Sequence, residues 1–577
     1  MNARRVLCIV AALATVVSCG RPPHQAAGPA APGAAPPATA PMAGMPAVPA
    51  SLADWAKGAQ LFDGLGSFHR KVSTSSEDAQ RYFDQGMRLL WGFNHDESTR
   101  SFARAAELDP KCAACLWGVA LTVGPNYNLP MMAKARAEVA WEALQQATRL
   151  APGASPAEQT LIAALARRYS GPDALDPTNE APPLRAYADA MRAAAKQFPA
   201  DDDVQALFAE SLMNTNAWKL WSLDGKPAEG TPEIVATLET VLARNPRHPG
   251  ANHYYIHALE ASPHPDQALA AAERLGPMAP SAGHLVHMPA HILQRIGRYE
   301  DAAEANRRGA SADASYVGRT QPLDYYPVAY TAHNYQFLAY SAAMEGRKAE
   351  TLASTDNSRN VVSDQMLIAM PGMDWYVAES YTARIRFGLW EEMLGMPAPN
   401  PKLTGLAGGF LYARAVALAA TGRVDEARAT LGELQRLVAA AAADAPAGQN
   451  TVRDVLGVAI ALVQARIAAA EKRSEDALRL LADAVAREDA LAYDEPSDWF
   501  FPVRHLLGAE LLKAGRAAAS EAVYREDLKR NPDNGWSLFG LSQALAAQHK
   551  DGEAKRVEAQ FRYAWQHADV TLTSSAL

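Results

Sequence analysis

The sequence predicts an all-α protein, an α-solenoid in which helical hairpins stack into a superhelix. The chain has 577 residues, more than one compact core normally holds. It is rich in Ala, Leu, Glu and Arg and has few strand signals. Four segments also share one pattern of turns, small residues and apolar residues: 93–110, 297–310, 422–435 and 515–532. Such self-similarity predicts a repeated helical unit.

Residues 1–19 predict a lipoprotein signal peptide. Two arginines precede an apolar stretch over residues 6–17, which is too short to span a bilayer. The sequence VVSC that ends at Cys19 resembles the bacterial lipobox, which implies that Cys19 is lipidated. A plain cleaved signal is the alternative. Gly20 after the cysteine points to the outer membrane, facing the periplasm or the cell surface.

Residues 20–50 predict a disordered tether, because they are Ala, Pro and Gly with almost no charge. Beyond the tether, no apolar run is long enough to cross a bilayer. We therefore expect a body that contacts the membrane only through its N-terminal lipid. The net charge of −8 is mild, and the absence of a basic stripe predicts no nucleic-acid partner.

The repeats are expected to form an N-terminal array over residues 51–390 and a C-terminal array over 391–568, followed by a tail at 569–577. The sequences FNHDESTRSFARAAELDP, GRYEDAAEANRRGA, GRVDEARATLGELQ and GRAAASEAVYREDLKRNP resemble the tetratricopeptide repeat. That repeat is a helical hairpin with Gly at its turn and small residues in both helices. The resemblance implies that first helices line a concave groove and that partners are proteins or peptides.

Two cysteines of the predicted array, Cys112 and Cys115, form a CAAC motif. In an oxidising export compartment this motif favours a local disulfide or a resting thiol pair. Half of a zinc site is the alternative, although the sequence has no second CxxC to complete it.

Histidine is concentrated in one stretch of the array. Seven of the 14 histidines lie between residues 248 and 291. The repeat register, set by residues such as Pro246, Gly297 and Gly346, puts six histidines on positions that face the groove in the family it resembles. They are His253 and His257 on one hairpin, His284, His287 and His291 on the next, and His333 on the third.

These six side chains predict a metal site in the groove. Residues three or four apart share one helix face, and neighbouring helices pack about 8–10 Å apart, so imidazoles from adjacent hairpins can reach one ion. Neutral imidazole binds copper, zinc and iron, and also nickel. Contacts to a peptide partner and pH sensing are the alternatives for the same residues.

Other residues within or near the histidine-rich stretch 248–291 also bear on this prediction. Glu210 is a candidate carboxylate ligand or general base. Pro289 lies in the middle of a predicted helix, so the helix either kinks there or begins late. His248 and His264 fall at hairpin corners and are expected to be solvated. GPNYN at 124–128 is not part of the generic repeat.

The function predicted first is that of a lipid-anchored envelope solenoid whose His-rich groove binds a divalent transition metal or a metal-bound small ligand. Metal handling and a metal-dependent enzyme with histidine ligands both fit that prediction. No established catalytic signature appears in the sequence. The alternative is an outer-membrane scaffold that binds a peptide in the groove without metal.

Overall fold

The computed structural model describes residues 48–576 apart from 131, 133, 176–179, 321, 323 and 324. The predicted signal peptide, the lipidation site Cys19 and all but the last three residues of the tether lie outside the described residues. The described residues belong to one compact unit, 35–577. None of its described helices has both the length and the apolar character that a bilayer span requires.

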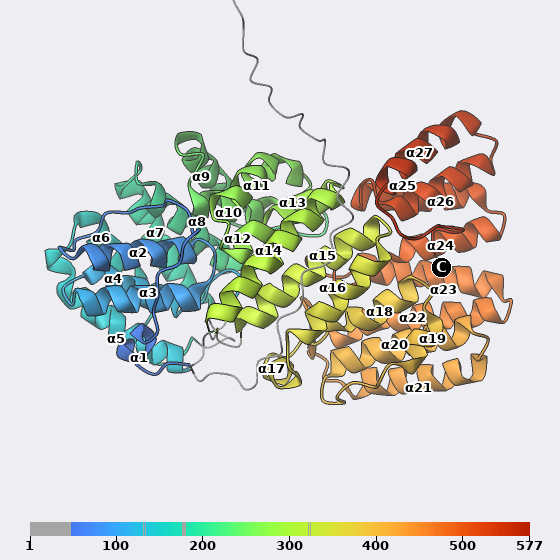
Figure 1. The fold of residues 1–577 in the computed structure, drawn as a ribbon, viewed down its shortest axis with the longest axis horizontal. Helices are drawn as coiled ribbons and strands as arrows, with labels where there is room; N and C mark the ends of the chain where they lie inside the picture. The colour runs from blue at the N-terminus through green and yellow to red at the C-terminus, as the bar shows by residue number, and fades with distance from the viewer. Residues whose placement is uncertain are drawn as a thin grey trace, which may run out of the picture. The chain divides into compact units, whose positions relative to one another are not determined.

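The structure is all-α, as the sequence predicts (Figure 1). The α-helices are α1 (Leu52–Ala56), α2 (Glu77–Leu90), α3 (His95–Leu108), α4 (Ala113–Thr122), α5 (Lys134–Leu150), α6 (Pro156–Leu165), α7 (Ala181–Gln197), α8 (Asp202–Met213), α9 (Thr231–Arg244), α10 (Pro249–Leu259), α11 (Leu269–Leu275), α12 (Gly283–His287), α13 (Pro289–Arg295), α14 (Tyr299–Arg319), α15 (Ala332–Met344), α16 (Lys348–Asn360), α17 (Asp364–Ala369), α18 (Glu379–Arg386), α19 (Trp390–Gly395), α20 (Thr404–Ala420), α21 (Val424–Ala440), α22 (Val452–Ala470), α23 (Ser474–Asp489), α24 (Val503–Lys513), α25 (Ala517–Arg530), α26 (Gly535–Ala546) and α27 (Asp551–Ala564). The short helical segments are η1 (Ala151–Gly153), η2 (Asn214–Asn216), η3 (Pro265–Ala268), η4 (Gly276–Met278), the π-helix η5 (Pro327–Thr331) and η6 (Tyr376–Ala378). Two short strands, β1 (Pro446–Ala447) and β2 (Asn450–Thr451), pair antiparallel.

One turn recurs between paired helices. Each copy of this turn contains one residue with a positive φ, between 52° and 80°. These residues are Phe93, Gly297, Gly346, Gly388, Gly422, Lys472, Gly515 and His549. The next residue then donates its N–H to the carbonyl five positions earlier, as Arg423 does to Leu418 at 2.8 Å. This Schellman arrangement satisfies the last carbonyls of a helix. All four segments whose similarity predicted the repeat begin at such a turn, so the repeat is confirmed.

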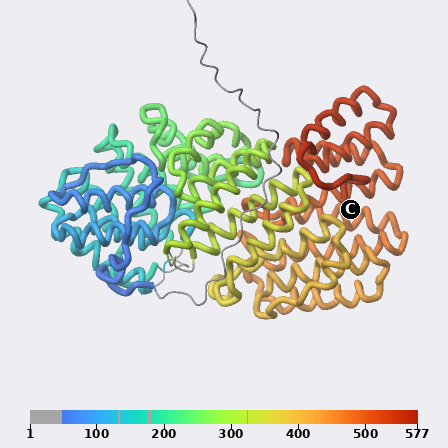
Figure 2. The backbone as a smooth tube through the Cα atoms, viewed as in Figure 1, coloured from blue at the N-terminus to red at the C-terminus, as the bar shows by residue number. Residues whose placement is uncertain are grey.

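Helices joined by these turns pack against each other, and successive pairs stack. Contacts join α2 to α3, α15 to α16, α20 to α21 and α22 to α23 within pairs, and α20 to α22 between pairs. The tube in Figure 2 follows this side-by-side order along the chain. Two large core clusters result, one from Trp55 to Tyr330 and one from Ala310 to Leu511.

The backbone is irregular where the histidines lie. α12 ends at His287 and α13 begins at Pro289, so the helix is broken at Met288 and proline occupies the first position of a new helix. The π-helix η5 leads directly into α15, which carries His333. The break lies in the hairpin of His284, His287 and His291, and the π-helix in the hairpin of His333, and each changes the direction of successive side chains.

Candidate metal centre

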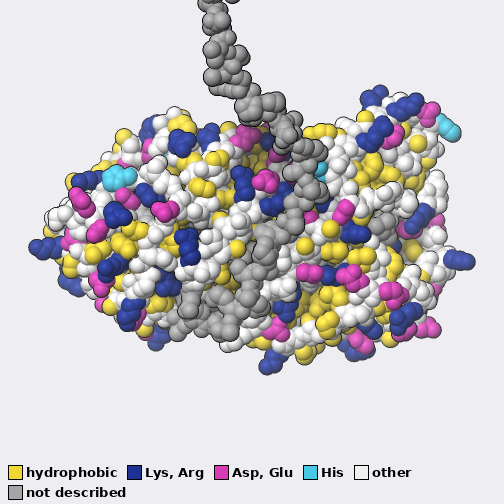
Figure 3. Space-filling view, viewed as in Figure 1, with side chains coloured by type: hydrophobic (Ala, Val, Ile, Leu, Met, Phe, Trp, Pro, Cys, Tyr) yellow, Lys and Arg dark blue, Asp and Glu magenta, His cyan; other side chains and the backbone are white. Residues whose placement is uncertain are grey.

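Six histidines from four helices meet in one place. His253 and His257 belong to α10, His284 and His287 to α12, His291 to α13 and His333 to α15. The first five are at most 3% exposed, and His333 is half-buried. On the face shown in Figure 3, histidine is visible at only a few places. The sequence register placed these side chains on positions that face the groove and did not predict their burial, which comes from other segments of the chain.

Aromatic rings from other segments close the site. The ring centroid of Phe93 lies 4.7 Å from that of His253 and 5.9 Å from that of His257. Tyr127, from the GPNYN motif, lies 5.2 Å from His257 and stacks on Trp218 at 5.5 Å. The motif is held in place by Arg168, which donates to the carbonyls of Pro125 and Leu121. A low-dielectric surround of this kind strengthens electrostatic interactions inside it.

The imidazoles form two groups of three. In the first, His253, His257 and His284 each offer a nitrogen within 4.8 Å of the others, and in the second, His287, His291 and His333 do the same. The Nε2 atoms of His253 and His284 are 3.1 Å apart. Those of His287 and His291 are 2.8 Å apart. Two histidine nitrogens on one ion, each about 2.0–2.1 Å from it, are separated by about 3 Å.

In three of the six histidines, His253, His257 and His287, the opposite ring nitrogen lies against an oxygen acceptor, whereas the buried Nδ1 of His284 has no hydrogen-bond partner in the described part of the chain. His253 Nδ1 lies 2.6 Å from the Trp91 carbonyl, and His287 Nδ1 lies 2.7 Å from Asn306 Oδ1. His257 Nδ1 lies 3.0 Å from Glu260 Oε1. Each acceptor places the proton on Nδ1 and leaves the Nε2 lone pair available, which is the arrangement that outer partners impose on metal-binding histidines. Within the described part of the chain, buried His257 Nε2 has no hydrogen-bond partner.

Two carboxylates complete the cluster. Glu260, the residue that caps α10, contacts His257 and also His291, whose Nδ1 lies 2.8 Å from Glu260 Oε2. His257, Glu260 and His291 form a third group within 4.8 Å, so Glu260 joins the two histidine groups. Glu495, from the loop between α23 and α24, pairs with His291 as well. Carboxylate and imidazole together suit first-row transition metals.

Burial dominates the electrostatics of the cluster. It lowers the pKa of His253, His257, His284 and His287 well below the ordinary value and lowers that of His333 to about 3. Burial opposes protonation of His291 too, but Glu495 and Glu260 outweigh it and raise the pKa of His291 to about 10. Burial also raises the pKa of Glu260, and that of Glu495 to about 7. The cluster therefore keeps most imidazoles neutral, the form that binds metal.

The structure places the other candidate residues elsewhere. Glu210 is buried but belongs to none of the three groups, and its carboxylate accepts from Asn214 at 2.7 Å. Burial raises the pKa of Glu210 to about 7. Cys112 and Cys115 form a disulfide at the start of α4.

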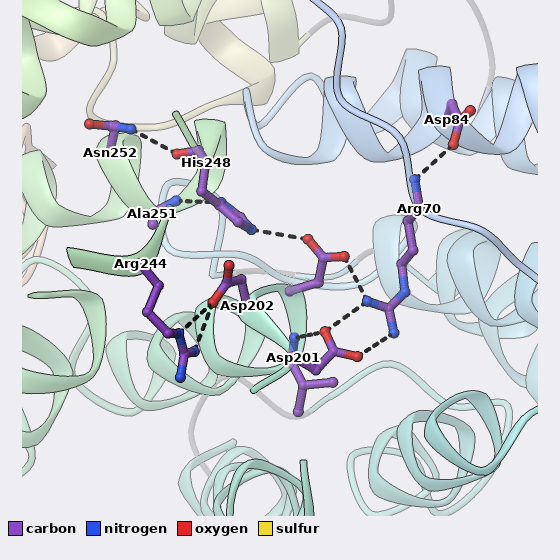
Figure 4. Close-up of polar contacts among 10 residues, drawn as sticks. Arg70, Asp84, Asp201, Asp202, Arg244, His248, Ala251 and Asn252 are labelled. Carbon is purple, nitrogen blue, oxygen red and sulfur yellow. Dashed lines mark hydrogen bonds and ion pairs between the residues drawn. The ribbon is translucent and has the colours of Figure 1, made fainter. Parts of the chain in front are cut away.

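The prediction that His248 is solvated is wrong, whereas His264 is exposed. His248 Nδ1 accepts from the N–H of Ala251 and so caps α10. Its Nε2 lies 3.0 Å from Asp203, and the same carboxylate accepts from Arg70 (Figure 4). This network is a structural link that fixes the start of the helix carrying His253 and His257.

Sequence reasoning missed Glu260 and Glu495. Glu260 follows His257 by three residues and shares its helix face, so helical periodicity was the signal for it. Glu495 lies in a loop more than 200 positions after His291, in a segment without repeat register, and no local pattern marks it.

No family model and no curated protein matches the chain. Among solved structures, it resembles a human IFIT1 dimer with m7Gppp-AAAA at 13% identity, covering 89% of this chain and 98% of that chain with a TM-score of 0.34. It resembles the APC/C hetero-tetramer Cut9–Hcn1 at 12% identity, over 89% and 81% of the two chains with a TM-score of 0.31. Yeast Tom70 matches at 12% identity, over 83% and 99%, with a TM-score of 0.29. Likenesses this low carry no argument about function.

Proposed function

We propose that this protein binds two transition-metal ions in a buried centre, one in each group of three histidines, with Glu260 between them. The observation that carries the proposal is the convergence of imidazole nitrogens in each group, with the rings of His253, His257 and His287 oriented through their Nδ1 atoms. If His287 and His291 were both neutral, their Nε2 lone pairs would face each other at 2.8 Å, and a cation bound by both would remove that repulsion. In the absence of metal, a proton on His291 serves the same purpose.

Charge supports the proposal. Glu260, Asp494 and Glu495 are buried beside the cluster, and buried carboxylates are stable only when paired or coordinated. His291 and, more weakly, Arg295 oppose the rise that burial causes in the pKa of Glu260 and Glu495, and Arg295 also donates to the backbone carbonyl of Glu260. Divalent ions would supply the remaining positive charge.

Metal analysis of the purified, untagged chain tests the proposal. After stripping and reloading with zinc, copper or iron, we expect about two ions per chain and a rise in Tm, because the ions bind only the folded state. His253→Ala and His333→Ala should each leave about one ion, since each removes a ligand from one group. His264→Ala, at an exposed position, is the matched control and should keep both.

Two outcomes bear against the proposal. A chain that stays metal-free and gains no thermal stability with any of the three metals overturns metal binding itself. Equal metal content in wild type, His253→Ala and His333→Ala overturns the assignment of one ion to each group.

A helical-repeat scaffold also suits the binding of other proteins. A peptide groove tuned by the six histidines receives no support from the structure of the site, because five of them are at most 3% exposed. Partner binding through other surfaces is compatible with a metal centre in the same chain.

We also propose, from the sequence of residues 1–19, that the chain is exported and anchored in the outer membrane through a lipid on Cys19. Cys19→Ser should abolish incorporation of a labelled fatty acid and release the chain from the membrane fraction. Cys8→Ser is the matched control, because this residue leaves with the signal peptide. Unchanged labelling of Cys19→Ser would refute the assignment.

A further inference from the structure

A cavity lies against one side of the histidine cluster. It offers about 110 Å³ of space to the centre of a water-sized molecule, several times the about 10–15 Å³ that one bound water needs, so a small molecule can enter it. His284, His291 and His333 line it, whereas His253, His257 and His287 do not. The cluster therefore presents one imidazole of the first group and two of the second to this space.

Away from the histidines, the cavity wall is apolar and aromatic. Val362, Leu367, Met373 and Val377 contribute aliphatic surface, and all but Met373 are nearly fully buried. Tyr330 connects this wall to the metal-facing end, because its ring centroid lies 4.7 Å from that of His284. An occupant of this wall would be a molecule with an apolar body.

The polar end of the cavity does not suit an anion. Asp494 and Glu495 line it, and among its described lining residues there is no Lys or Arg. Asp494 and Glu495 together offset the two positive charges of a divalent ion held by His287, His291 and His333, so a further carboxylate or phosphate would add a negative charge that nothing in the lining balances. Hydrogen-bonding capacity is available instead: the amide of Gln449 lines the cavity, and the buried hydroxyl of Ser358 has no hydrogen-bond partner in the described part of the chain.

We propose that this cavity binds a small uncharged organic molecule whose apolar body packs on Val362, Leu367 and Val377. Its single oxygen or nitrogen donor reaches the metal held by His287, His291 and His333. The inference rests on the proposed metal centre and adds the class of ligand and the side from which it approaches.

Cobalt-loaded full chain provides the test, because the visible absorption of Co²⁺ changes when a ligand enters its coordination shell. Three probes share a phenyl ring and differ in charge: 2-phenylethanol, 2-phenylethylamine and phenylacetate. We expect 2-phenylethanol to shift the cobalt spectrum and to bind at least about tenfold more tightly than phenylacetate. The amine should be weaker than the alcohol, because its ammonium form has no lone pair to donate to the metal.

A variant that fills the cavity provides a second, independent test of ligand binding. Ala329 is half-buried, lines the cavity and lies in η5, so Ala329→Trp adds volume there. It should keep its cobalt and lose at least about tenfold in affinity for 2-phenylethanol. Ala470→Trp, at an exposed position at the end of α22, is the control and should bind the probe as wild type does.

The outcomes separate the two proposals. A chain that binds no cobalt overturns the metal centre and this inference with it. A cobalt-loaded chain that ignores 2-phenylethanol, or binds phenylacetate as tightly, overturns only the inference. If Ala329→Trp does not fold, the charge series in wild type still decides.

Discussion

Asn306 lies outside the histidine cluster and orients His287, one of the proposed metal ligands. His287 Nδ1 donates to Asn306 Oδ1, and the Asn306 amide is oriented by donating in turn to the Ala302 carbonyl at 2.7 Å. We predict that Asn306→Ala weakens metal binding about 10- to 100-fold, because the ring loses its fixed tautomer and orientation. Titration of the stripped protein with zinc against a chromophoric chelator measures the effect.

Asn306→Asp is the matched variant, because a carboxylate keeps an acceptor at the same place. Its zinc affinity should equal or exceed that of wild type. A purely structural role for Asn306 would lower the Tm of both metal-free variants and leave their zinc affinity unchanged, which would contradict the prediction.

Asp313 predicts a pH dependence of stability away from the cluster. Burial raises its pKa to about 7 from an ordinary 3.8, although Tyr326 and Asn334 donate to it. The folded chain therefore holds this proton more tightly than the unfolded chain. The stabilisation is complete below about pH 4 and is lost as the pH rises toward about 7.

Asp313→Asn removes this titration. We expect the free energy of unfolding, measured by urea denaturation between pH 4.5 and pH 7.5, to fall less steeply with pH than in wild type, by up to about 1.4 kcal/mol per pH unit. The variant is expected to be less stable at the acid end, because its NH2 group replaces one of the two carboxyl oxygens and then faces the donor of Tyr326 or Asn334. Parallel pH profiles for the two proteins would exclude Asp313 as the source.

Two copies of the repeated turn differ in whether a lysine or a glycine adopts the positive φ. Lys472 and Gly515 occupy the same place in two turns, with φ of +60° and +73°. Lys472 is exposed, and a Cβ at Gly515 would meet nothing within 4 Å. Exchanging lysine and glycine at either position therefore changes only the free-energy cost of the positive φ. We predict that Lys472→Gly stabilises the fold by up to about 1 kcal/mol and that Gly515→Lys destabilises it by a similar amount.

Urea denaturation of the two variants and of the double exchange measures this pair. The double exchange should lie close to wild type, because the two turns are separate and such effects add. A loss of stability in Lys472→Gly would show that the lysine side chain, not the backbone, decides at that turn.

The same turns explain what the sequence could predict. Glycine at positive φ and small residues in both helices are local requirements, so they leave a periodic signal, and the array was recognised from it. The break at Pro289 was also readable, because proline cannot continue a helix from within. The π-helix η5 left no such signal, since its backbone is decided by packing around it.

In the whole molecule, the repeat register correctly predicted that the six histidines lie close together, but it did not predict the segments that surround them. An open groove follows from repeats alone, whereas Phe93, Tyr127, Trp218 and the loop of Glu495 fill it from outside the three hairpins. Such contacts join segments far apart in sequence and depend on tertiary packing. The meeting of the six histidines was therefore predictable, and their burial was not.

Glu495 makes the centre a link between distant parts of the chain. It lies after α23 and contacts His291 of α13, so a metal bound to that group would restrain the loop at 490–502. We predict that zinc slows amide hydrogen exchange in this loop as well as in α10, α12 and α13, because opening the loop would then disrupt the environment of the bound ion. In Glu495→Gln, the helices should remain protected by zinc while the loop loses its protection. Zinc that protects the helices and leaves the wild-type loop unchanged would show that the carboxylate lies beside the centre without being held by it.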